Sequence, residues 1–181
     1  MRSSFSTLFR SPLRSSRAWS ALLATAAVAG SMLTACGTPF VALGTLAALT
    51  MPRRTALLTV AAAWLANQLL GFGLLGYPLD GATIVIGVAM GLAALIATTV
   101  AGAVTSTGRI PARPVAALAI AFVSQQLALY AIVTIVGAVC PFTPAVVAAV
   151  AYNEAIWFTG LLGLYVVVRL LTGGRQRRIA A

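Results

Sequence analysis

Long apolar runs, separated by short segments that contain Arg, Pro and Gly, make up most of the chain. The first run, Ala18 to Met51, contains no charged residue. As one helix it would be about 50 Å long, well over the ~30 Å of a bilayer's hydrocarbon core. It therefore has to fold back, and Cys36-Gly37-Thr38-Pro39 is the expected turn because Gly and Pro break helices.

The same pattern predicts four further helices, so the expected fold class is all-α, a polytopic bundle of six transmembrane helices. The predicted ranges are 18–35, 39–52, 55–76, 82–105, 115–138 and 145–171. The helical domain, 18–171, follows a basic N-terminal segment, 1–17, and precedes a basic tail, 172–181.

Composition supports this class, since 61% of the 181 residues are hydrophobic and only 8% are charged, against about 25% charged in soluble domains. All twelve basic residues are arginines. Eleven of them fall in the N-terminal segment, the 52–54 turn, the 106–114 loop and the tail, and Arg169 lies near the end of the last predicted helix. The turns at 36–39, 77–81 and 140–144 have none. The positive-inside rule then places both termini on the cytoplasmic side of the membrane. We expect that membrane to be the inner membrane of a bacterium. A five-span arrangement would put Arg53 and Arg54 outside.

Residue types that are absent or rare in the sequence exclude several classes of function. The chain has no histidine and only two acids, Asp80 and Glu154, which argues against an enzyme and against a metal or other cofactor site. Nucleic-acid binding is not expected, because the arginines lie between apolar runs rather than over a polar face with stacking aromatics. The lipid bilayer is the first expected partner.

Polar and aromatic residues inside the predicted spans are the candidate substrate site, because unsatisfied polar groups are costly in a bilayer. Asn67, Gln125 and Glu154 lie about 18, 17 and 14 Å from the ends of their helices, so all three reach the middle of the membrane. The candidate substrate-binding residues are Trp64, Asn67, Gln68, Gln125, Gln126, Tyr130, Asn153, Glu154 and Trp157. The amides could equally hold helices together.

Glu154 is the most informative of these residues, because no basic residue lies near it in its span to pair with it. Arg169 lies further along the same helix, near its cytoplasmic end. We expect it to be protonated or to hold a cation or a hydrogen-bond donor of a substrate. Asp80, in the turn before the fourth helix, is explained by helix capping or as a surface charge. Small residues at Gly87 and Gly91 predict close helix packing.

The two cysteines, Cys36 and Cys140, both fall on predicted outer turns, where a disulfide is permitted. The alternative is that each is a small apolar residue at a helix end. Leu33-Thr34-Ala35-Cys36 also matches a bacterial lipoprotein signal, in which the cysteine carries lipid. An apolar segment follows, however, where a polar tether is usual.

A chain of this length with six spans, cytoplasmic termini and polar residues opening outward resembles the S components of energy-coupling-factor vitamin transporters. The resemblance implies a vitamin or metal ion as substrate and docking on a separate ATPase-driven module. Those proteins carry small residues on the first helix, whereas here the series Ala93, Ala97 and Ala101 lies on the fourth.

These features together predict a membrane protein that binds and translocates a small molecule or ion through a polar site at mid-depth. It would act as the substrate-binding subunit of a larger transporter. The alternative is a non-transporting scaffold or assembly protein, in which the amides form contacts between helices.

Overall fold

The computed structural model describes residues 16–33, 39–106, 113–137 and 142–179, and all regular secondary structure in these residues is helical. The helices are α2 (Ser16–Leu33), α3 (Phe40–Thr50), α4 (Arg53–Gly73), α5 (Gly81–Ser106), α6 (Arg113–Val136) and α7 (Pro144–Ile179). The predicted all-α class is confirmed, and the six helices fit the predicted ones in order and approximate position.

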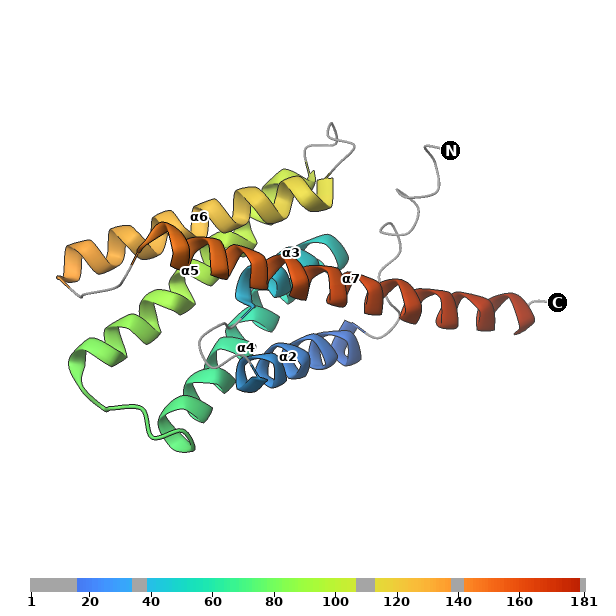
Figure 1. The fold of residues 1–181 in the computed structure, drawn as a ribbon. Coiled ribbons are helices and arrows are strands. Elements are labelled where there is room, and N and C mark those ends of the chain that lie inside the picture. Colours follow the sequence, from blue (N-terminus) through green and yellow to red (C-terminus); the bar gives the residue numbers. More distant parts are fainter. Residues whose placement is uncertain (1–15, 34–38, 107–112, 138–141, 180–181) are drawn as a thin grey trace.

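Four of these helices are long and apolar enough to cross a membrane: α4, α5, α6 and the part of α7 from Pro144 to Leu171. The helical backbone of α7 continues to Ile179, past the apolar part, and in Figure 1 it extends well beyond the other helices. Since α3 has 11 residues, it is about 16 Å long, half the thickness of a hydrocarbon core.

The short helix α3 lies at the centre of the bundle and packs against all five other described helices. In Figure 1 it lies between the α5–α6 pair and the α2–α4 pair, with α7 crossing beside it. Every residue from Phe40 to Ala47 is buried. A helix that is apolar all round belongs in an interior, and α3 has that composition, FVALGTLAALT.

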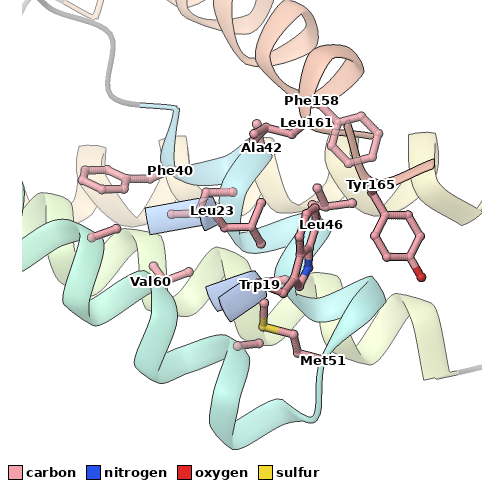
Figure 2. Close-up of a cluster of buried hydrophobic side chains, with 14 of the residues drawn as sticks. Trp19, Leu23, Phe40, Ala42, Leu46, Met51, Val60, Phe158, Leu161 and Tyr165 are labelled. Atoms are coloured by element: carbon pink, nitrogen blue, oxygen red, sulfur yellow. The ribbon is translucent and has the colours of Figure 1, made fainter. Parts of the chain in front are cut away.

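The main core surrounds the sides of α3, as Figure 2 shows. It brings together Leu23 of α2, Val60 of α4 and Leu161 of α7, around Leu43 and Leu46 of α3. A second, smaller cluster joins α3 to α5 and α6 through Val41, Ala97, Ala101, Ala117 and Ala121. Because alanines form most of this second cluster, the three backbones can approach closely.

Glycine permits two of the closest approaches between helices. A Cβ at Gly44 of α3 would overlap the Thr98 hydroxyl of α5, and a Cβ at Gly91 of α5 would overlap the Trp64 ring of α4. Gly87 and Gly91 are both buried, so the predicted packing role of this pair is confirmed.

Candidate functional site

Glu154 of α7 binds the N-terminus of α3. Its carboxylate accepts hydrogen bonds from the backbone N–H groups of Val41, at 3.3 Å, and Ala42, at 2.7 Å. The side chain is only 2% exposed. It lies ten residues into α7, about 15 Å along the helix axis from Pro144. The hydrogen-bond donors for this buried acid are therefore backbone groups of the protein itself.

The local sequence explains why α3 needs this partner. The first N–H groups of a helix have no acceptor within the helix, and the residue before α3 is Pro39, whose side chain makes no capping bond. Burial excludes water as the acceptor, since Pro39, Phe40 and Val41 are all buried. A carboxylate suits this position because the N-terminus of a helix carries partial positive charge.

The spacing of buried residues on α7 brings Glu154 to this point. Glu154, Phe158, Leu161 and Tyr165 are the buried residues of α7 between Pro144 and Leu171, where its side chains are described. Their spacing of three or four places them on one face. This face packs on α3. The acid is thus the first residue, in chain order, of an otherwise apolar or aromatic stripe, and it lies at the level where α3 begins.

Gln125 of α6 is a second polar residue in this part of the core. It is 7% exposed, and its side-chain oxygen has no hydrogen-bond partner within the described residues. It lies one turn beyond Ala121, which packs in the cluster with Val41. Val41 therefore links the two sites: its N–H binds Glu154, and its side chain packs beside the α6 face that carries Gln125.

Thr45 of α3 is the other described side chain with a buried oxygen that has no partner. It lies one turn after Val41, and it is completely buried. Other helical threonines, such as Thr98 and Thr59, donate to the carbonyl four residues earlier. The Thr45 hydroxyl does not, so the core keeps two unpaired oxygens on α3 and α6. Sequence reasoning missed Thr45, because a single threonine in an apolar helix carries no distinguishing signal.

Two of the predicted site residues instead join α4 to α5. The Trp64 Nε1 group donates to the carbonyl of Gly87 at 2.8 Å. Gln68, one turn further along α4, packs against Gly87 as well. These two side chains therefore fill the space that Gly87 and Gly91 leave open, which is the role of a contact between helices.

The remaining candidates are spread over the bundle. Trp157 packs against Gly30 of α2, while Tyr130 is exposed and stacks edge to face with Phe142. Asn67, Gln126 and Asn153 are half-buried. The structure thus does not gather the nine candidates into one site, and it places Glu154 and Gln125 deepest. The cysteines, Cys36 and Cys140, lie outside the described residues.

Asp80 caps the N-terminus of α5. Its carboxylate accepts bonds from the Thr83 N–H at 2.8 Å and from the Thr83 hydroxyl at 3.1 Å. These bonds, the backbone one first, hold the pKa of the exposed Asp80 carboxyl below its usual value. The predicted capping role is confirmed.

The opposite end of α3 carries a cluster that sequence reasoning also missed. Trp19 Nε1 donates to the Thr50 hydroxyl at 3.1 Å, and the Trp19 ring lies 5.4 Å from that of Tyr165. Arg169 Nε donates to the Tyr165 hydroxyl at 3.0 Å. The Ser20 hydroxyl contacts the Met51 sulfur at 3.6 Å. Together these contacts fasten α2 and α7 to the end of α3.

The fold and site define an all-helical protein with several potential membrane spans, built around a buried half-length helix. Comparison of the chain with protein-family models, curated proteins and solved structures finds no match.

Proposed function

We propose that the chain is a multi-pass protein of the bacterial inner membrane that binds a small solute where α3 begins. The observation that carries the proposal is the Glu154 carboxylate on the N–H groups of Val41 and Ala42. In many transporters, interrupted helices end near the middle of the membrane, and their termini form the binding site. A half-length helix that ends on a buried acid fits that arrangement.

The membrane placement rests on the four apolar helices and on the charges at their ends. Arg53 and Arg54 begin α4, and Arg169 lies near the end of the apolar part of α7. With these ends in the cytoplasm, α3 rises from Thr50 to the middle of the bilayer, because its 11 residues cover about half the hydrocarbon core. Glu154 then lies at the same depth.

The unpaired oxygens favour a solute that donates hydrogen bonds. The Gln125 oxygen and the Thr45 hydroxyl are buried without partners in the described part of the chain, and an unpaired buried acceptor costs about 1–3 kcal/mol. A vitamin-like molecule with amine or amide groups would supply the missing donors, and a cation would instead be coordinated by these oxygens. If translocation is driven by ATP, the drive would come from a separate ATPase-driven coupling module as a partner.

The test is a thermal-shift assay on the purified chain in detergent, with thiamine, biotin, riboflavin, Ni²⁺ and Co²⁺ as probes. We expect one probe class to stabilise the protein. Gln125→Leu should abolish that shift because it removes the unpaired oxygen. Gln126→Leu is the matched control, since Gln126 is the neighbouring amide on a less buried face. A shift that survives Gln125→Leu would contradict the site.

A scaffold or assembly function is the second candidate, and the α4–α5 contact favours it. Trp64 and Gln68 both act there as contacts between helices, as the polar residues of a non-transporting bundle would. For a scaffold, we expect no probe to stabilise the chain, and a protein partner to co-purify in fixed stoichiometry.

A further inference from the structure

Four arginines lie at the end of the bundle that carries the cluster of Trp19, Thr50 and Tyr165. Ser20 and Trp19 of α2 bond to Met51 and Thr50, so Arg17, one turn before Ser20, lies at this end. Arg53 and Arg54 follow Met51 directly in the chain. Arg169 is connected to the same cluster because it bonds to Tyr165, whose ring packs on Trp19. Figure 2 shows Trp19, Met51 and Tyr165 together in this region.

Arg169 is held in place by its neighbour. Its Nε bonds to the Tyr165 hydroxyl, and the centre of its guanidinium lies 5.5 Å from the Tyr165 ring. The side chain is half-buried, whereas Arg17, Arg53 and Arg54 are exposed. A guanidinium presents a planar fork of donors that matches phosphate oxygens. Arg169 is thus held in a fixed position, and the three exposed arginines lie at the same end of the bundle.

The protein has no acidic side chain to neutralise this end. Its only two acids are Asp80 and Glu154. Glu154 lies at the other end of α3, and Asp80 follows α4, whose 21 residues separate it from Arg53 by about 30 Å. The two acidic side chains of the sequence therefore supply no negative charge at this end of the bundle.

We propose that this end of the bundle binds the headgroup phosphate of an anionic phospholipid. The inference rests on the proposed membrane placement, which puts the arginines at the level of the headgroups. Trp19 and Tyr165 support the lipid as the source of the phosphate, because such aromatics are enriched at the membrane interface. Anionic lipids attract arginines at the cytoplasmic surface.

The experiment measures lipid binding to the purified full-length chain by native mass spectrometry. Phosphatidylglycerol and phosphatidylcholine with the same acyl chains are titrated separately, and inorganic phosphate is the third probe. We expect phosphatidylglycerol to bind at least about fivefold more tightly than phosphatidylcholine. Inorganic phosphate should neither bind nor compete. Tighter binding of inorganic phosphate would overturn the lipid as the ligand.

Variants locate the site. Arg169→Gln should weaken phosphatidylglycerol binding by about fivefold, and Arg53→Gln with Arg54→Gln by more. Arg175→Gln is the matched control, because it removes the same charge from the same helix six residues further on. Equal losses from Arg169→Gln and Arg175→Gln would overturn the site in favour of diffuse attraction.

Reconstitution of the unaltered chain into nanodiscs tests the headgroup site and the membrane placement separately, since the inference rests on that placement. We expect the chain to incorporate into nanodiscs of either lipid. Enrichment of phosphatidylglycerol around the protein in mixed discs then supports the headgroup site. Incorporation without enrichment overturns the headgroup site alone. Failure to incorporate into either lipid overturns the membrane placement as well.

Discussion

The two acids of this protein both cap helix N-termini, but in opposite surroundings. Asp80 is exposed, and it binds Thr83, three residues away on the same helix start. Glu154 is buried, and it binds backbone groups 112 and 113 residues earlier in the chain. The first bond serves local structure only, whereas the second joins two helices in the core.

The difference shows what burial adds to the same chemistry. At Asp80, water can replace the carboxylate if the side chain is lost. At α3 no water competes, so the helix start depends on Glu154 alone among the described side chains for these two N–H groups. The position of α3 and the position of α7 are consequently coupled through one residue.

Glu154→Leu should have the largest effect. It leaves the N–H groups of Val41 and Ala42 buried without acceptors, and we expect a loss of about 3 kcal/mol in the free energy of unfolding. Glu154→Gln should lose about half as much, since one amide oxygen can still accept a bond. The measurement is a titration of the purified chain with sodium dodecyl sulfate, in which circular dichroism monitors the unfolding. Equal stability of Glu154→Leu and the wild type would refute the capping role.

The sequence allowed the Asp80 cap to be predicted and did not allow the Glu154 partner to be predicted, for a physical reason. A local cap depends on a side chain and a helix start a few residues apart, which sequence shows. The partner of Glu154 is backbone, so no side-chain type at positions 41 and 42 points to it. The sequence predicted that the acid is buried without a basic partner, but only the fold supplies its donors.

The helices themselves were predictable because apolar runs and Gly or Pro turns are local signals. The grouping of the candidate residues was not, since it depends on which face each residue takes. Gln125 and Gln126 are adjacent, yet only Gln125 continues the spacing of Ala117 and Ala121 and is buried. That four-residue spacing is the signal in the sequence that separates the two amides.

Gly44→Ala should have an intermediate effect, because it tests whether tight packing of α3 maintains the Glu154 bonds. The added Cβ would overlap the Thr98 hydroxyl, which is fixed by its bond to the Ala94 carbonyl. We expect a loss of about 1–3 kcal/mol in the free energy of unfolding by the same assay. Adding Thr98→Ala should restore part of it, since the overlapping hydroxyl is then absent.

The control for Gly44→Ala is Gly160→Ala in α7. A Cβ at Gly160 would meet nothing within 4 Å, so this variant should be no less stable than the wild type. Combining Gly44→Ala with Glu154→Gln sharpens the comparison. If the shift of α3 in Gly44→Ala already weakens the Glu154 bonds, the double variant will lose less stability than the sum of the two single losses. Strict additivity would show that the helix packing and the cap are independent.

Asp80→Asn should have the smallest effect, because an exposed asparagine caps a helix nearly as well as aspartate. The test is how the stability difference between the wild type and this variant depends on pH. Since the Thr83 bonds lower the pKa of Asp80 in the folded protein, the carboxylate stabilises the fold above the pKa of the unfolded chain, about 4. That contribution is lost as pH falls through the lowered pKa. The stability difference between wild type and Asp80→Asn, measured at pH 7 and pH 3, should therefore narrow at pH 3, and a difference that widens would show that the folded pKa is raised.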